Sequence, residues 1–116
     1  MLMTDCIFCK IVAGQIPAQV VWQDENAMAF RDIHPKAPVH VIFIPKRHAD
    51  GWGDLDDAPF LASLGAGIRA VAEREGVAAT GYRILSNNGE DGGQEVMHLH
   101  VHLVGGKPLG PMLLQR

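Results

Sequence analysis

The sequence is short of positive charge. Its 10 lysines and arginines are outnumbered by 13 aspartates and glutamates, which gives a formal net charge of −3 at pH 7. Such a chain has no basic footprint for nonspecific binding to a polyanion, so we expect no partnership with long nucleic acid. A small phosphate ligand is not excluded, because a few local donors rather than the net charge hold it.

Long apolar runs are also missing. Stretches such as residues 39–45 are far shorter than the roughly 20 residues that a membrane-spanning helix needs. The start, MLMTDC, lacks the basic and then apolar pattern of a secretion signal. We therefore expect a cytoplasmic protein with no membrane partner. A length of 116 residues suits one modest core, so we expect a single domain over residues 1–116.

Cysteine is scarce, and both cysteines lie in one motif, Cys6-Ile-Phe-Cys9. In a reducing compartment this spacing indicates metal or redox chemistry more than a structural disulfide. On a helical turn the two sulfurs would share a face and supply half of a tetrahedral site. Two reduced cysteines without a metal are the alternative.

Histidine is concentrated instead. Three of the six histidines, His98, His100 and His102, fall at alternate positions in the stretch VMHLHVHLV. In a strand over residues 96–104 all three imidazoles would project from one face, where they make a poor hydrophobic surface and a good polar site. Imidazoles serve both as metal ligands and in nucleophilic catalysis, and the row alone does not decide between these roles. His34 and His40 we expect to be structural.

The preceding segment, residues 87–93, is rich in asparagine and glycine. Glycines let backbone N–H groups approach a ligand, as a phosphate cradle requires, although an ordinary turn has the same composition.

The remaining pattern predicts an α+β domain, with helices packed on an antiparallel sheet. Residues 39–44 are apolar at nearly every position, which predicts a central strand that ends at Pro45. We expect one helix from a cap at Asp5 through Ala13 and another from a cap at Asp57 that ends before Gly76. Strands are expected over residues 19–23, 27–31, 39–44, 82–85 and 96–104.

The run His98-Leu-His100-Val-His102-Leu-Val resembles the signature of histidine triad proteins, in which three histidines alternate with apolar residues. Further likenesses follow along the chain: Ile7-Phe8-Cys9-Lys10-Ile11, Ile16-Pro17-Ala18, Ala29-Phe30-Arg31-Asp32-Ile33, Ala37-Pro38, Ile44-Pro45-Lys46-Arg47-His48, and Asn87 with Asp91-Gly92-Gly93-Gln94. The chain is most similar to the histidine triad nucleotide-binding (Hint) branch, and its ending, residues 105–112, resembles the bacterial members.

This resemblance implies a histidine-triad-like fold, with a five-stranded antiparallel sheet and two helices, in a homodimer that joins two sheets. It also implies hydrolysis of purine nucleoside 5′-phosphoramidates through a covalent nucleotidyl-histidine. The nucleophile would be His100, and His102 would contact the phosphate or the leaving group. The nucleotide-binding residues would be Asn87, Gly93 and Gln94 at the phosphate, Asp32 at the ribose, and Ile7, Phe8, Ile11, Phe30 and Ile33 around the purine.

Some bacterial relatives with the Cys-x-x-Cys motif bind zinc, and the resemblance implies a structural Zn²⁺ on Cys6, Cys9, His48 and His98. One position departs from the animal pattern, because Glu95 stands where those proteins carry a serine that donates to the leaving nitrogen. An ionised carboxylate cannot donate and repels an incoming phosphate if it points inward. Two alternatives therefore stay open: a dinucleoside polyphosphate hydrolase, and a nucleotide- or zinc-binding interaction protein with little turnover.

Overall fold

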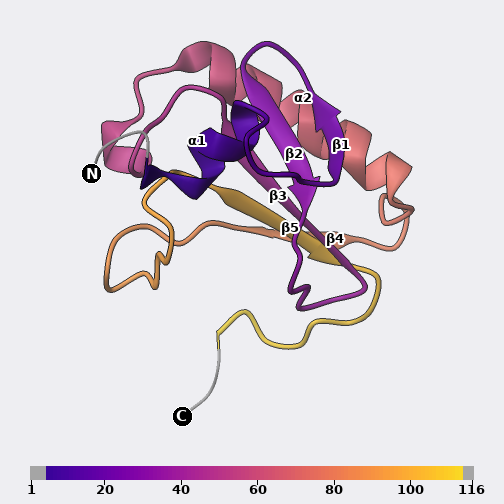
Figure 1. Ribbon diagram of the computed structural model, residues 1–116. Helices are drawn as coiled ribbons and strands as arrows, with labels where there is room; N and C mark the ends of the chain where they lie inside the picture. The colour runs from indigo at the N-terminus through magenta and orange to yellow at the C-terminus, as the bar shows by residue number, and fades with distance from the viewer. Residues whose placement is uncertain (1–4, 114–116) are drawn as a thin grey trace.

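The computed structural model describes residues 5–113 and confirms the α+β class (Figure 1). Five antiparallel strands form one sheet in the order β1-β2-β3-β5-β4, with two α-helices and a short 3-10 turn. The elements are α1 (Ile7–Val12), β1 (Val20–Gln23), β2 (Ala27–Arg31), β3 (Val39–Pro45), η2 (Trp52–Asp54), α2 (Ala58–Arg74), β4 (Tyr82–Leu85) and β5 (Val101–Gly105). None of the helices in the described part of the chain is long and apolar enough to cross a bilayer.

Strand β3 lies at the centre of the sheet, as its continuous apolar sequence predicts, and it is buried on both faces. Because side chains alternate along a strand, Val41 and Phe43 face one layer while Ile42 and Ile44 face the other. The first pair packs under α2 and the second under α1, so each helix covers one face of the sheet (Figure 1).

Helix α2 begins where the sequence predicts. The side chain of Asp57 accepts a hydrogen bond from the Phe60 N–H at 3.0 Å, and Pro59 lies in the first turn, where its missing N–H costs nothing. Phe60, Leu64 and Val71 then pack onto the sheet. At the other end of the helix, Glu75 forms a two-pronged ion pair with Arg31 of β2.

Helix α1 begins later than we expected, because its N-terminal cap is Cys6 and not Asp5. The Cys6 Sγ atom accepts a hydrogen bond from the Cys9 N–H at 3.3 Å, and the Cys6 side chain is buried, whereas Asp5 is exposed. The same two cysteines therefore cap the helix and carry the site described below.

The last strand is also shorter than the predicted 96–104, since pairing with β3 ends at Phe43 and Val101. Continuing this register would place Leu99 opposite Pro45, which has no N–H to give to a ladder. The Leu99 N–H makes no bond in the sheet and donates instead to the Ala49 carbonyl at 2.7 Å. As a result, His98 and His100 precede the strand, and only His102 lies on it.

Candidate active site and metal cluster

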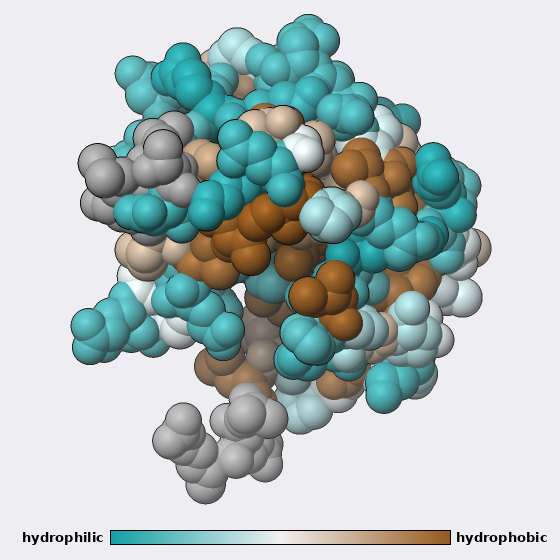
Figure 2. Space-filling view, viewed as in Figure 1, coloured by the Kyte–Doolittle hydropathy of each residue, from teal (hydrophilic) through white to brown (hydrophobic). Residues whose placement is uncertain are grey.

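A cavity of about 590 Å³ opens on the face of the sheet that carries α1. Figure 2 shows hydrophobic side chains gathered around a hollow on this side of the molecule. The cavity brings together ten of the residues predicted for catalysis and nucleotide binding, namely Ile7, Phe8, Ile11, Phe30, Asp32, Ile33, Asn87, Gly93, His100 and His102. Glu95 lines it too, while Gln94 does not.

The apolar end of the cavity is built around Phe8. Its ring meets Phe30 edge-on, with centroids 5.6 Å apart, and meets His100 in the same way at 5.2 Å. Ile7 and Ile33 are exposed at this end, so their side chains are free to contact a ligand. A flat apolar slot beside polar groups suits a ligand with an aromatic base and a phosphate.

His100 is held in one orientation and one protonation pattern. Its Nδ1 atom lies 2.8 Å from the His98 carbonyl oxygen, which can only accept, so Nδ1 carries the proton. In the neutral ring Nε2 is then unprotonated. This arrangement leaves a nucleophilic nitrogen on a residue that lines the cavity and is only 7% exposed.

His102 is paired with His40, a residue for which we had expected only a structural role. The His102 Nδ1 atom lies 2.9 Å from His40 Nε2, and a carboxylate oxygen of Asp32 lies 3.5 Å from the same His40 atom. Burial lowers the pKa of His102 to about 4, with further contributions from His100 and His40. Burial also lowers the pKa of His40, with Lys36 adding to the effect and Asp32 opposing it.

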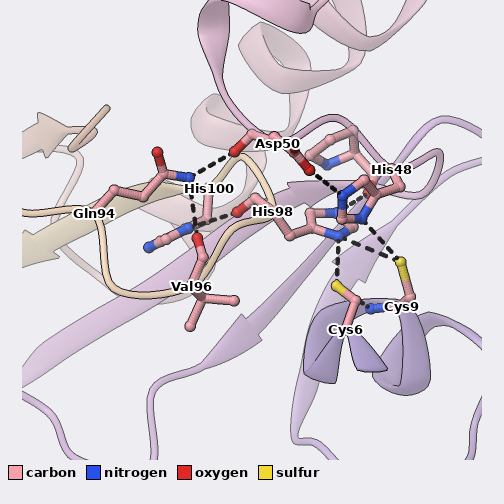
Figure 3. Close-up of polar contacts among 9 residues, drawn as sticks. Cys6, Cys9, His48, Asp50, Gln94, Val96, His98 and His100 are labelled. Atoms are coloured by element: carbon pink, nitrogen blue, oxygen red, sulfur yellow. Dashed lines mark hydrogen bonds and ion pairs between the residues drawn. The ribbon is translucent and has the colours of Figure 1, made fainter. Parts of the chain in front are cut away.

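The asparagine- and glycine-rich loop is held largely by Gln94. Its side-chain amide donates to the carbonyls of Asp50 (2.6 Å) and Val96 (3.0 Å), and its side-chain oxygen accepts from the Gly89 N–H (Figure 3). The backbone N–H groups of Gly93 and Gln94 donate to carbonyls of the loop itself. A phosphate role for Gly93 and Gln94 therefore stays a prediction, and the contacts seen for Gln94 are structural.

The four predicted metal ligands meet in one cluster: Cys6, which caps α1, Cys9 of α1, His48 from the loop after β3, and His98 (Figure 3). Their ligand atoms all lie within 4.8 Å of one another. The Nδ1 atom of His98 lies 3.2 Å from Cys6 Sγ and 3.5 Å from Cys9 Sγ, and the Nδ1 atom of His48 lies 3.3 Å from Cys9 Sγ.

The surroundings of this cluster prepare it for a cation. His98 Nε2 donates to the Pro45 carbonyl at 2.9 Å, and His48 Nε2 lies 2.6 Å from an Asp50 carboxylate oxygen, so both Nδ1 atoms are left to face the sulfurs. Burial is the main cause that lowers the pKa of His98 to about 4, which keeps this imidazole in the neutral form that binds metals. Two sulfurs and two imidazole nitrogens fit the tetrahedral preference of zinc.

In the metal-free protein Cys9 is a poor acid. Burial, followed by the hydrogen bond and the charge interaction with Cys6, raises the pKa of the Cys9 thiol to about 11. Such a thiol is protonated at neutral pH and is not an activated nucleophile. The cysteine pair is therefore not activated for redox catalysis, and a metal would bind it with release of the thiol proton.

The sequence could not reveal the His40–His102 pair, because 62 residues separate the two histidines. The pairing register of the sheet provides the missing information. It places Ile42 opposite His102 and Val104 opposite His40, which makes the two histidines diagonal neighbours on one face.

Comparisons with known proteins agree with this geometry. The family model described as HIT domain matches residues 13–109. Purine nucleoside phosphoramidase of Escherichia coli (strain K12) is 44% identical, over 97% of this chain and 96% of that protein. Protein HitA of Neisseria gonorrhoeae is 42% identical, over 89% of this chain and 97% of that protein.

Solved structures give the same result. A histidine triad protein from Clostridium difficile superposes with a TM-score of 0.90 at 41% identity, and the match covers 97% of this chain and 100% of that chain. A HIT family hydrolase from Clostridium thermocellum gives a TM-score of 0.91 at 39% identity, with the same coverage. The chain therefore belongs to the HIT domain family.

Proposed function

We propose that this protein is a hydrolase that cleaves purine nucleoside 5′-phosphoramidates to the nucleoside monophosphate and an amine. The observation that carries the proposal is the 2.8 Å contact between His100 Nδ1 and the His98 carbonyl, which leaves Nε2 unprotonated inside the cavity. The purine nucleoside phosphoramidase of E. coli, at 44% identity over nearly the whole chain, supports the substrate class.

In the proposed reaction the leaving nitrogen is protonated and the lone pair of His100 Nε2 attacks the α-phosphorus. The P–N bond then breaks with its electron pair moving to the leaving nitrogen, which departs as a neutral amine. The ring then carries a positive charge, which the His98 carbonyl stabilises through the Nδ1–H. Water hydrolyses the nucleotidyl-histidine in a second step and regenerates His100.

The nucleotide would lie along the cavity, with its phosphate near His100 and its base in the apolar slot around Phe8. Asp32 also lines the cavity, and its carboxylate can accept hydrogen bonds from ribose hydroxyls. Asn87, which lines the cavity as well, would donate to a phosphate oxygen.

A zinc ion on Cys6, Cys9, His48 and His98 would have a structural role in this enzyme. Four protein ligands leave no open position for a substrate, and a bound ion supplies a crosslink that ties α1 to the two loops carrying the histidines. His98 would then act on the reaction only through its carbonyl oxygen.

We further propose a single-domain, cytoplasmic homodimer in which each C-terminal tail reaches toward the partner's site. Strand β4 is an edge of the sheet, and Tyr82, Ile84 and Leu85 are all more than a third exposed. An uncovered apolar edge strand favours pairing with another copy. Size-exclusion chromatography with light scattering tests this assembly.

The activity is tested by phosphorus NMR of the protein with adenosine 5′-phosphoramidate, beside His100→Ala and the control His34→Ala. The His34 side chain is exposed and lies outside the cavity. We expect AMP to form with the native protein and the control but not with His100→Ala. Absence of conversion by the native protein, with AMP still bound in calorimetry, contradicts the hydrolase and supports a binding protein. Faster turnover of a dinucleoside polyphosphate contradicts the proposed substrate class.

A further inference from the structure

The ring of His40 is fixed at both of its nitrogens. Its Nδ1 atom accepts a hydrogen bond from the backbone N–H of Lys36 at 3.0 Å, and its Nε2 atom lies 2.9 Å from His102 Nδ1. The ring is 7% exposed, so water has little access to either nitrogen. Each of these contacts restricts where a proton can be placed.

The Lys36 N–H is a backbone amide and can only donate, so His40 Nδ1 has no proton. The neutral His40 ring must then carry its proton on Nε2, which points at His102. His102 Nδ1 is the acceptor in this bond, and the proton of the neutral His102 ring is therefore on Nε2. A doubly protonated His102 would place an N–H opposite the N–H of His40.

We propose that His40 is a positioning residue that holds His102 as a neutral imidazole with its proton on Nε2, so that His102 is a fixed hydrogen-bond donor to the phosphoryl group and not an acid. The donor role of His102 toward a phosphoryl group rests on the proposed function. The protonation pattern itself follows from the two contacts of His40.

The charged groups around the pair fit this assignment. Asp32 favours a charged His40, but its carboxylate lies 3.5 Å away, and the second proton would have to enter where the Lys36 N–H already points. The side-chain charge of Lys36 opposes protonation, as does a charged His100 beside His102. Besides Asp32 and Lys36, the charged residues that line the same cavity are Arg31, Arg83 and Glu95.

The assignment changes the proton balance of the reaction. If His102 released its Nε2 proton it would become an anion, and His40 could not replace that proton without becoming an anion itself. The leaving nitrogen must therefore take up a proton from solvent before the P–N bond breaks, so the N-protonated phosphoramidate is the form that reacts. His100 Nε2 then bonds to phosphorus, the P–N electron pair stays on nitrogen, and a neutral amine departs while both His40 and His102 keep their protons. A proton returns to solvent when water later hydrolyses the nucleotidyl-histidine.

Two substitutions of His40 separate positioning from a structural role. In His40→Asn the side-chain oxygen can replace Nδ1 and keep the Lys36 N–H bond, but no donor reaches His102. In His40→Gln the side-chain amide can replace Nε2 and donate to His102, while the bond to Lys36 is lost. If His40 has only a structural role, His40→Asn should keep more of the native kcat. If His40 positions His102, His40→Gln should keep more.

We expect kcat of His40→Asn on adenosine 5′-phosphoramidate to fall by at least about tenfold, as for other residues that orient a reacting group. We expect His40→Gln to stay within about threefold of the native kcat, because one modest hydrogen bond is exchanged for another. Equal losses in the two variants, or a better Asn variant, overturn the proposal.

Nitrogen-15 NMR of the histidine rings tests the same inference without turnover. Two-bond correlations distinguish a protonated from an unprotonated ring nitrogen in the native full-length protein. We expect His102 to show a protonated Nε2 and an unprotonated Nδ1, and to lose this single pattern in His40→Asn. A protonated Nδ1 on native His102 overturns the proposal. If the native protein hydrolyses no phosphoramidate, the proposed function fails, and the ring spectra still decide the state of His102.

Discussion

The carbonyl oxygen of His98 lies 2.8 Å from Nδ1 of His100, while the His98 ring lies among two cysteine sulfurs. One residue thus contributes its side chain to the candidate metal cluster and its backbone to the orientation of the candidate nucleophile. Residues 96–100 have no place in the sheet ladder, so their position depends on such local contacts. A change in the cluster should therefore reach the active site.

The double substitution Cys6→Ser, Cys9→Ser tests this link. We expect loss of bound zinc, a lower melting temperature, and a fall of roughly tenfold or more in kcat/KM, as is common when a supporting shell is removed. The fall has two causes: His98 loses its anchor, and α1 carries Phe8 of the apolar slot. Elemental analysis, thermal unfolding and steady-state kinetics give the three readouts.

Asp50→Asn is the matched control, because it keeps all four ligands and changes only the carboxylate beside His48. We expect zinc affinity to fall by roughly 10- to 100-fold and the melting temperature to recover at saturating zinc. A double cysteine variant with native zinc content and native melting temperature would contradict the assignment of the cluster.

Helix α2 offers a test of packing with two glycines two residues apart. A Cβ on Gly67 would lie 2.6 Å from the Trp22 ring, whereas a Cβ on Gly65 would meet nothing within 4 Å. We expect Gly65→Ala to stabilise the protein by about 0.5–1 kcal/mol, because alanine is the better helix former. Gly67→Ala should destabilise it by about 1–3 kcal/mol through overpacking. Urea unfolding measures both, and a stabilising Gly67→Ala would show that α2 is not seated against Trp22.

Local patterns were sufficient to predict much of this fold. The apolar run of β3 predicts a strand covered on both faces, and the Asp57 cap predicts the start of α2, because these signals depend on neighbours in the sequence. The end of β5 depends instead on which residue lies opposite it. Pro45 stops the ladder from 54 residues away from Leu99, and no property of the sequence around Leu99 reveals this.

The candidate site, too, was predictable from the sequence only in part. A motif places His98, His100 and His102 together, and the family resemblance assigns His98 to the cysteines, as the structure shows. Neither of them reveals that His102 faces His40. The strand-like alternation would have put all three rings on one face. The early end of the strand separates them, so that one triad histidine joins the cysteines in the candidate metal cluster and the other two line the cavity.

The stability of the protein should depend on pH through His102. Its pKa is lowered to about 4 in the folded protein, against about 6.5 in an unfolded chain. Between these values the unfolded chain binds a proton that the folded protein does not, so the free energy of unfolding decreases as pH falls from about 6.5 toward 4. Above about pH 6.5 the His102 ring is neutral in both the folded and the unfolded chain, and its contribution to the free energy of unfolding no longer changes with pH.

His102→Gln removes the titrating ring, and we expect the variant to lose less stability than the native protein between about pH 7 and pH 5. The two losses in the free energy of unfolding should differ by on the order of 1 kcal/mol, because solvent screens a ring that is partly exposed. Urea midpoints at the two pH values measure it, with His34→Gln as the exposed control. Parallel losses in native protein and His102→Gln would show that His102 does not cause the pH dependence.

Asp32 provides a test of how the nucleoside binds. Its Oδ1 atom accepts a hydrogen bond from the His34 N–H at 2.8 Å, which helps to fix a carboxylate that lines the cavity. If it accepts from the ribose hydroxyls, Asp32→Ala should weaken AMP binding by roughly 10- to 100-fold. Calorimetry with 2′,3′-dideoxy-AMP is the control, since the native protein and the variant should bind this analogue equally. An equal loss for both ligands would contradict a ribose contact.

Glu95 decides how the cavity receives a negatively charged substrate. It is exposed and lines the cavity, as do His100 and Asn87, the residues proposed to contact the phosphate. An ionised carboxylate there repels a phosphate by about 1 kcal/mol at 4 Å in water. We expect Glu95→Gln, which has the same size and no charge, to lower KM for adenosine 5′-phosphoramidate by about two- to fivefold at low salt, the range that this energy allows.

Ionic strength distinguishes charge repulsion between Glu95 and the phosphate from a direct contact between Glu95 and the substrate. The effect of Glu95→Gln should shrink at high salt, because salt screens interactions between exposed charges. Glu90→Gln removes a charge from the same loop outside the cavity, and we expect it to change KM less. A higher KM in Glu95→Gln would mean that the carboxylate accepts a hydrogen bond from the substrate. The position that carries a serine in animal relatives would then help to bind the leaving amine in this protein.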